Sequence, residues 1–452
     1  MKFTKFGKAL LMSALSVGVV LSVTSCVQSY TVGYLYVTGT VTAQSSGEGI
    51  ISGFKIDHNT GFLTPINGLP VSSGGANPGR AVLQVAGRFL YVLNRGVTAS
   101  GGSNCTTADP CLNSNITQFA VGANGILTPQ ETFFTQGINP FRIIGDSTGN
   151  FLYVLEHDSP VTLANGTIVP SSATNPNKNC GLSLGTGVTT CGDITSFEIN
   201  QTTGRLQLVV NAQVTSANGT ALSYFPVPAN PIDFVSSSGY VFTVSGTPTT
   251  GDSVFPYTQA NGQLNVSQNS SQPLNANQVT AIVSGGTFIY VLDNEPGTTS
   301  SSSQILPFTV TANGNGSLSA AIGGAIPDDP TESNPIMLLV ESKNKWAYVA
   351  NQGNLTNPNN AASGIAGYVI DPNTHQLTFL PDEPFGTGAG PQCLVEDPSN
   401  QFIYTANFDD SSVTGRSIDE NTGDLRNLSG SANRAYSLTG PATWCLVTGR
   451  TN

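Results

Sequence analysis

The sequence is poor in charge. Only 10% of its 452 residues are Asp, Glu, Lys or Arg, against roughly 25% in an ordinary soluble domain. Basic residues are the scarcer kind, 16 against 27 acidic ones, and the formal net charge is −11. Binding to a nucleic-acid backbone needs a basic surface, so this balance argues against a nucleic-acid partner. Disorder pairs low hydrophobicity with dense charge, and a chain with 38% hydrophobic residues fits neither condition.

Helical periodicity and long apolar runs are also missing from the body of the sequence. In their place are 50 glycines and 27 prolines, which is more than a helix-rich protein tolerates. Short runs of β-branched and aromatic residues alternate with turn residues along the whole chain. The composition therefore predicts a large, turn-rich, all-β protein.

The N-terminal segment has the pattern of an export signal. Three lysines precede an apolar run from Ala9 to Val23, which is too short for a comfortable membrane span. The end of this run, Val23-Thr24-Ser25-Cys26, resembles a bacterial lipobox, in which the cysteine is lipidated. We predict a signal peptide over residues 1–25, lipidation of Cys26 and a short tether over residues 26–32. The alternative is a plain signal peptide followed by an incidental cysteine.

Cleavage after residue 25 would leave 13 basic and 27 acidic residues, a net charge of −14. No later stretch is long and apolar enough to span a membrane. The sequence therefore predicts a protein exported to the bacterial cell envelope, either the periplasm or the outer membrane. Its only membrane contact would be the lipid anchor.

Cysteine usage agrees with export. The six cysteines after Cys26 suit three disulfides in an oxidising compartment. They are Cys105, Cys111, Cys180, Cys191, Cys393 and Cys445. The first four would close two short loops, Cys105 with Cys111 and Cys180 with Cys191. Zinc is the competing interpretation, but no Cys-x2-Cys pair or nearby His supports it.

A four-residue strand motif returns seven times. It runs aromatic, aliphatic, aromatic, and then usually Val, as in Phe89-Leu90-Tyr91-Val92. Its third residues lie 48 to 89 positions apart. They are Tyr36, Tyr91, Tyr153, Phe242, Tyr290, Tyr348 and Tyr404. A Pro-led strand precedes most copies, and two further short strands follow each. Four strands in each of seven units predict a seven-bladed β-propeller over residues 33–450.

The two ends of the repeat region complement one another. The first unit lacks an innermost strand, whereas Thr443 to Val447 form a strand without a unit of its own. Pairing the two would close the ring. Cys393 and Cys445 would then lie on innermost strands of neighbouring blades, where we expect them to form the third disulfide.

Chain order also predicts where a site would lie. The starts of the innermost strands and the ends of the second strands converge on one mouth of the central channel. Two insertions, near residues 95–115 and 156–193, emerge on the same face, and rigid scaffolds usually carry function on such loops. The polar residues expected at this mouth are Arg80, Asn94, Arg95, Arg142, Glu156, His157, Asp158, Asp233, Asp293, Asn294, Asn351 and Asn407.

The strand motif and a following hairpin, Phe-x-Ile-Asp/Asn with Thr-Gly-x-Leu, resemble the seven-bladed lactonase family. That family includes bacterial 6-phosphogluconolactonase and fungal carboxy-muconate lactonizing enzyme. The resemblance extends over residues 33–450 and implies hydrolysis of a sugar-type lactone at the channel mouth. The recurring residues are packing and turn residues, so they are more specific for the fold than for the activity.

Lactone hydrolysis needs a base for water and a donor or cation for the oxyanion. The resemblance implies Glu156 or His157 as the base and Arg80 and Arg142 as the groups that hold the oxyanion, a carboxylate or a phosphate. We further expect a small lactone or carbohydrate-like ligand, no required cofactor and a monomer.

Two alternatives remain open. One is an envelope propeller without catalysis that binds a ligand, polymer or protein partner. The other is a Ca²⁺ ion in the channel, held by oxygen ligands. Those ligands would be Asn94, Glu156, Asp293, Asn351 and Asn407.

Overall fold

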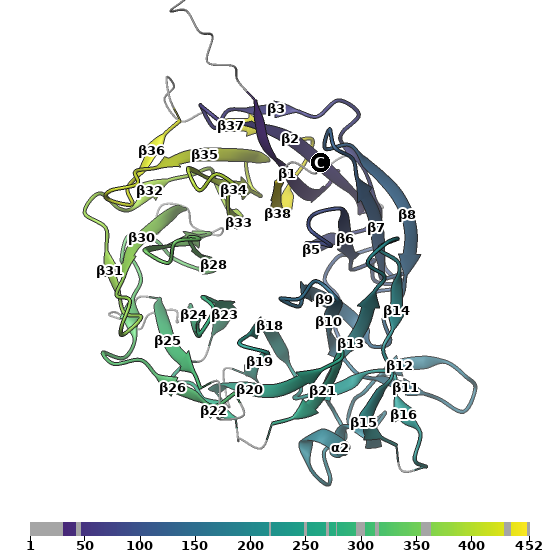
Figure 1. Ribbon diagram of the computed structural model, residues 1–452. Coiled ribbons are helices and arrows are strands. Elements are labelled where there is room, and N and C mark those ends of the chain that lie inside the picture. Colours follow the sequence, from purple (N-terminus) through teal and green to yellow (C-terminus); the bar gives the residue numbers. More distant parts are fainter. Residues whose placement is uncertain are drawn as a thin grey trace, which may run out of the picture.

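The computed structural model describes residues 30–41, 47–216, 218–247, 251–267, 271–276, 278–294, 303–311, 316–353, 363–428 and 435–449. The predicted signal peptide and Cys26 lie outside these residues. Seven sheets form a ring, as the repeat predicts (Figure 1). No helix among the described residues is long and apolar enough to cross a membrane.

Each blade is an antiparallel sheet whose innermost strand lines the centre of the ring. From blade 1 to blade 7 the innermost strands are β38 (Ala442–Gly449), β5 (Pro78–Gln84), β9 (Ile138–Gly145), β18 (Pro231–Ser237), β23 (Val279–Ser284), β28 (Pro335–Val340) and β33 (Pro391–Glu396). The second strands, which carry the repeated motif, are β1 (Thr31–Thr40), β6 (Phe89–Asn94), β10 (Phe151–Asp158), β19 (Tyr240–Thr247), β24 (Phe288–Asp293), β29 (Trp346–Asn351) and β34 (Phe402–Asn407).

The outer part of each blade comprises two or three further strands. The third strands are β2 (Glu48–Asp57), β7 (Asn115–Val121), β13 (Gly192–Ile199), β20 (Gly251–Ala260), β25 (Gln304–Val310), β30 (Gly364–Ile370) and β35 (Ser412–Ile418). The fourth are β3 (Leu63–Pro65), β8 (Leu127–Phe133), β14 (Leu206–Leu208), β21 (Gln263–Val266), β26 (Leu318–Ala320), β31 (Leu377–Phe379) and β36 (Leu425–Asn427).

Every blade except blade 2 adds a short fifth strand that pairs with its third strand, a feature the four-strand repeat did not predict. These strands are β4 (Val71–Ala76), β17 (Phe225–Val227), β22 (Gln272–Pro273), β27 (Ile326–Pro327), β32 (Phe385–Gly386) and β37 (Ala435–Ser437). Blade 3 also carries the hairpins β11 (Pro160–Thr162) with β12 (Ile168–Pro170) and β15 (Asn211–Thr215) with β16 (Ala221–Leu222).

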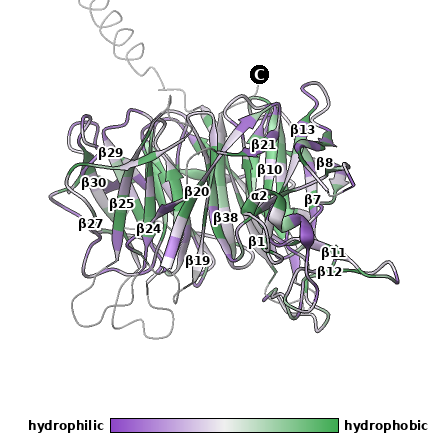
Figure 2. Cartoon of the chain, turned by 90° about the horizontal axis from the view of Figure 1, so that it is seen from below, coloured by the Kyte–Doolittle hydropathy of each residue, from purple (hydrophilic) through white to green (hydrophobic). Residues whose placement is uncertain are grey.

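The first of these hairpins projects beyond the ring when the molecule is seen from the side (Figure 2). The insertion that contains it also has one short 3₁₀ helix, η1 (Lys178–Cys180), and one α-helical turn, α2 (Gly181–Leu184). The sequence, which lacks helical periodicity, did not predict these two short helical elements.

The repeated motif joins each blade to the next one. Tyr404, in β34 of blade 7, donates a 2.7 Å hydrogen bond to the carbonyl of Gly61 in an outer turn of blade 1. Tyr348 of blade 6 makes the same bond to Gly423 of blade 7. These turn glycines have positive φ, and a Cβ at Gly61 would lie 2.5 Å from the Phe402 ring. The aromatic residues of the motif therefore pack against glycine turns of the neighbouring blade, which explains why both recur.

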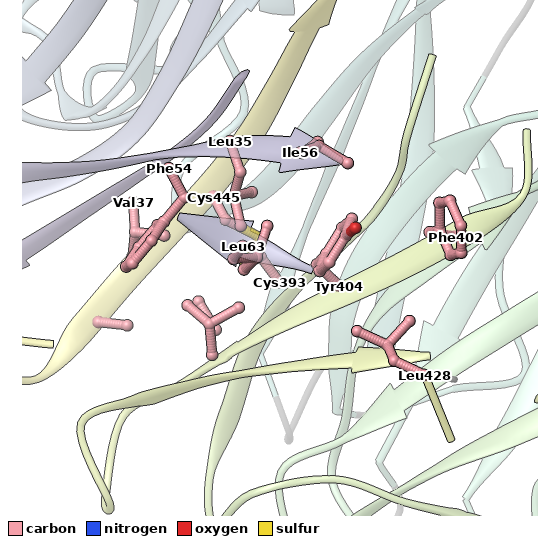
Figure 3. Close-up of a cluster of buried hydrophobic side chains, with 13 residues drawn as sticks. Leu35, Val37, Phe54, Ile56, Leu63, Cys393, Phe402, Tyr404, Leu428 and Cys445 are labelled. Atoms are coloured by element: carbon pink, nitrogen blue, oxygen red, sulfur yellow. A yellow bond between two sulfur atoms is a disulfide. The ribbon is translucent and has the colours of Figure 1, made fainter. Parts of the chain in front are cut away.

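The ring closes through the C-terminal strand. Strand β38 pairs antiparallel with β1, placing Leu446 opposite Tyr36. A disulfide between Cys393 and Cys445 joins β33 of blade 7 to β38 of blade 1. Buried side chains from both blades surround it (Figure 3). The predicted closure is confirmed.

The other two disulfides are also the predicted pairs. Cys105–Cys111 lies in the insertion after β6, and Cys180–Cys191 lies in the insertion after β10. Both therefore close loops on the face to which the second strands lead.

Candidate functional site

Residues from several blades line one cavity of about 520 Å³ at the channel mouth. They come from the starts of innermost strands and from loops that follow second strands, as chain order predicts. The lining residues are Thr40, Asn77, Pro78, Gly79, Arg80, Arg95, Ser103, Phe141, Arg142, Thr280, Ile336, Gln352, Gln392, Phe408, Thr443 and Trp444. We call this cavity the mouth.

Two of the predicted residues, Arg80 and Arg142, meet at a single carboxylate. Arg80 Nη1 lies 3.0 Å from Asp233 Oδ1, and its Nη2 donates to Oδ2 at 3.2 Å. Arg142 Nε lies 3.3 Å from the same Oδ1. The backbone N–H of Ile282 also donates to Oδ2, at 3.2 Å. Because these residues belong to β5, β9, β18 and β23, the carboxylate of Asp233 links four consecutive blades (Figure 1).

Burial makes this cluster electrostatically unusual. The Asp233 side chain is 1% exposed, whereas that of Arg142 is 31% exposed and faces the mouth. Burial and the neighbouring charge of Arg80 lower the pKa of Arg142 to about 10, and the charge of Asp233 partly opposes this. Burial also lowers the pKa of Arg95. At neutral pH three guanidinium groups thus face one carboxylate, which suits an anionic ligand.

Aromatic side chains support the guanidinium groups. The Arg80 guanidinium lies over the Trp444 ring, 4.6 Å from its centroid, and that of Arg142 lies 5.2 Å from the centroid of Phe141. Such cation–π contacts fix the orientation of the groups in a partly desolvated site. Trp444 belongs to β38, so the strand that closes the ring also forms a wall of the mouth.

His157 lies beside the mouth but does not line the cavity. Its ring centroid is 6.5 Å from that of Phe141, and its side chain is 37% exposed. Its Nδ1 lies 3.1 Å from Oδ1 of the buried Asp158. Asp158 also accepts hydrogen bonds from Thr107 Oγ1 and Asn139 Nδ2, both at 2.8 Å. Asp158 thereby ties the insertion that holds the Cys105–Cys111 disulfide to the end of β10.

The prediction that Glu156 faces the mouth is wrong. Its side chain is fully buried within blade 3, where it accepts hydrogen bonds from the backbone and hydroxyl of Thr195 on β13. Burial, above all, raises the pKa values of Glu156 and of Asp193 beside it, and the like charges of the two carboxyls raise that of Asp193 further. A shift in strand register between Leu155 and Glu156 accompanies this inward orientation.

The five residues considered for Ca²⁺ are likewise not brought together. Each occupies the end of the second strand in a different blade, and each is fully buried. Asn94 bonds with Ser73, Asn115 and Thr117, and Asn351 donates to Glu332. Asn407, Asp293 and Glu156 are also bonded within their own blades. They act as buried hydrogen-bonding groups inside the sheets, which is why the polar position recurs.

Sequence reasoning placed Arg95 and Asp233 at the mouth without giving either a role, and it missed the aromatic wall. Asp233 is the carboxylate that forms ion pairs with the two predicted arginines, Arg80 and Arg142. Trp444 lies in β38, the C-terminal strand that completes blade 1, so ring closure brings it beside Arg80 of blade 2. The position of Trp444 in the closing strand was the one available indication.

The sequence matches the family described as "Lactonase, 7-bladed beta-propeller" over residues 33–164 and 302–437. The chain belongs to this family. A search of curated proteins finds no match to the sequence.

Solved structures with the same fold include two proteins assigned as 6-phosphogluconolactonases. The one from Bacteroides uniformis is 16% identical, with a TM-score of 0.62 over 93% of this chain and 100% of its own. The one from Bacteroides fragilis is 15% identical, with a TM-score of 0.61 over 92% and 98%. The periplasmic gluconolactonase PpgL of Pseudomonas aeruginosa is 17% identical, with a TM-score of 0.60 over 93% and 100%. At these identities the similarity establishes the fold alone.

Proposed function

We propose that the protein hydrolyses a sugar-type lactone at the mouth. The observation that carries this proposal is the pairing of Arg80 and Arg142 across Asp233 in a cavity of a lactonase-family propeller. Ester hydrolysis places negative charge on the carbonyl oxygen in the transition state and produces a carboxylate. Preorganised guanidinium groups in a partly buried site stabilise both.

In the proposed reaction, water attacks the lactone carbonyl carbon while Arg80 and Arg142 face the developing oxyanion. His157 takes the proton from water. The ring C–O bond then breaks, and the ring oxygen receives that proton, leaving a hydroxy acid. Asp158, 3.1 Å from Nδ1, favours the tautomer in which Nε2 is the free base. Glu156 has no role in this scheme because its carboxyl group is buried away from the cavity.

The similar proteins named for lactonase activity favour a sugar lactone as the substrate class, and one is described as periplasmic. Together with the three disulfides, this favours export of the present chain. We propose further that Cys26 is lipidated and anchors a monomeric propeller to the cell envelope. Radiolabelled fatty acid should then be incorporated into the expressed wild type and not into Cys26→Ser.

Acid release from a panel of lactones, followed in a pH-stat, tests the proposed activity. We expect hydrolysis by the wild type. Losing one oxyanion donor in Arg142→Ala should lower kcat by roughly 10²-fold. His157→Gln should lower it by roughly 10²-fold or more. Arg205→Ala removes a 68% exposed arginine that pairs with Glu131, and it should match the wild type. The proposal fails if no lactone yields acid faster with the wild type than with His157→Gln.

A second function is favoured by one specific observation. Among the described residues that line the mouth, none is a carboxylate or a histidine. A propeller that binds an acidic ligand or partner without catalysis would need no base in that lining. Binding of a sugar acid by a wild type that hydrolyses no lactone would support this alternative.

A further inference from the structure

Arg95 differs from the other two arginines of the mouth. It directly follows β6 and is the first residue of the insertion that leads to β7. Its backbone N–H donates to Asn77 O at 3.0 Å, and its carbonyl accepts from Ser114 Oγ at 2.7 Å. Its Cδ lies 3.6 Å from the point where Gly79 would carry a Cβ, so the stem passes close to the start of β5. The backbone is therefore held on both sides, while the side chain reaches the mouth.

The guanidinium of Arg95 has no anionic partner. Arg80 and Arg142 share Asp233, but no carboxylate lies within ion-pairing distance of Arg95 in the part of the chain that is described. Its Nε is buried and makes no hydrogen bond there. A partly desolvated cation that the protein itself leaves unmatched is suited to hold an anion from outside the protein. Burial also lowers the pKa of Arg95, in keeping with a partly desolvated charge.

Charge matching explains what this group is suited to bind. Asp233 offsets one of the three positive charges, so the mouth keeps a net charge of about +2 within a chain of net charge −11. The carboxylate that forms when a lactone opens would match only one of these. The remaining charge suits a second acidic group on the same ligand.

We propose that Arg95 is a specificity-determining residue that binds an acidic substituent of the ligand, a carboxylate or a phosphate, apart from the group held by Arg80 and Arg142. This inference rests on the proposed site but does not require that the protein hydrolyse anything. It assigns the ligand to the sugar acids or lactones that carry a second anionic group.

Calorimetric titration of sugar acids into the full chain tests this assignment. D-gluconate carries one anionic group, whereas D-glucarate and 6-phospho-D-gluconate carry two, ending in a carboxylate or a phosphate. We expect Arg95→Gln to weaken binding of at least one two-anion acid by about tenfold to a hundredfold. Binding of D-gluconate should change by less than about threefold. The acid that loses more affinity identifies the second group.

Two matched variants separate recognition from structure. Arg95→Lys keeps the charge but loses the planar fork, so its affinity should fall between those of Arg95→Gln and the wild type. Arg205→Gln removes a charge outside the mouth and should bind as the wild type does. Because Arg95 makes no side-chain bond to the described residues, Arg95→Gln should also melt within about 2 °C of the wild type, a shift of the order that 1 kcal/mol produces in a large domain.

The outcomes are distinct. The inference is overturned if Arg95→Gln weakens all three acids equally, if it weakens none, or if the wild type binds no two-anion acid. A wild type that binds these acids in an Arg95-dependent manner but opens no lactone would refute the proposed hydrolysis and leave this inference standing.

Discussion

Glu332 is a buried carboxyl group that pairs with no cation among the described residues. It is 7% exposed, and its Oε2 accepts a 2.8 Å hydrogen bond from Asn351. Its Oε1 occupies the space that Gly364 leaves by lacking a side chain. Burial, followed by the nearby charges of Asp328, Asp329 and Glu383, raises its pKa to about 9. The pKa of Asp328 is raised to about 6 and that of Glu383 to about 7, again chiefly by burial.

These shifts predict that the protein loses stability as pH rises. In the unfolded chain the Glu332 carboxyl ionises near its ordinary pKa of 4.5, whereas the folded protein keeps the proton up to about pH 9. The folded state thus binds more protons between these values, and the free energy of unfolding falls across that window. Glu332→Gln should remove much of this pH dependence. At pH 9 its free energy of unfolding should exceed that of the wild type by roughly 2 kcal/mol.

Urea unfolding at pH 5, 7 and 9 measures this difference. Glu420→Gln, at an exposed turn position, serves as the control and should follow the wild type at each pH. Parallel pH profiles for Glu332→Gln and the wild type would contradict the prediction.

Single residues also mark the limit of what the sequence predicts. The repeat correctly located Arg80 and Arg142 at the mouth, because both follow Pro-led strand starts. It failed for Glu156, because the polar position at the end of the second strand points into the sheet, beside a register shift that recurs between the two inner strands of the other blades. Asp233 was placed at the mouth but given no role, because its two arginine contacts cross from blade 4 to blades 2 and 3.

At the scale of elements, the outer hairpin turns determine how blades pack. The sequence predicted these turns from their Asp/Asn-to-Gly patterns. It did not predict that each glycine receives an aromatic ring of the preceding blade, because that contact depends on how strongly the ring curves. Gly61 against Phe402 and Gly423 against Trp346 are two such contacts.

The Gly61 contact gives a test with a matched control. Gly61 and Gly239 both have positive φ, 68° and 82°. A Cβ at Gly61 would lie 2.5 Å from Phe402, whereas one at Gly239 would meet nothing within 4 Å. Gly239→Ala should therefore show only the backbone cost of about 1 kcal/mol. Gly61→Ala should lose a further 1–3 kcal/mol or so from overpacking. Equal losses in chemical denaturation would refute the role of the aromatic contact.

For the whole molecule, closure determines stability, since a ring has no end blade that unfolds alone. The sequence predicted this closure because the first unit lacked a strand that the C-terminus supplied. The geometry of the mouth was less predictable, since it joins residues of β5, β9, β23 and β28 with Trp444 of β38. Strand β38 pairs with β1 and is tied by a disulfide to β33, so blades 1 and 7 are held together covalently.

Removing that disulfide should weaken the ring as a unit. The Cys393–Cys445 bond spans 52 residues and Cys105–Cys111 spans 6. Loop entropy therefore predicts losses of about 4 and about 2 kcal/mol for the paired serine variants.

The only two tryptophans, Trp346 in blade 6 and Trp444 in blade 1, can report on unfolding of their own blades separately, in the variants Trp444→Phe and Trp346→Phe respectively. In Cys393→Ser/Cys445→Ser both reporters should shift to the same lower denaturation midpoint, because each blade packs on two neighbours. A shift confined to Trp444 would mean that blade 1 detaches while the other blades stay folded, which a cooperative closed ring does not permit.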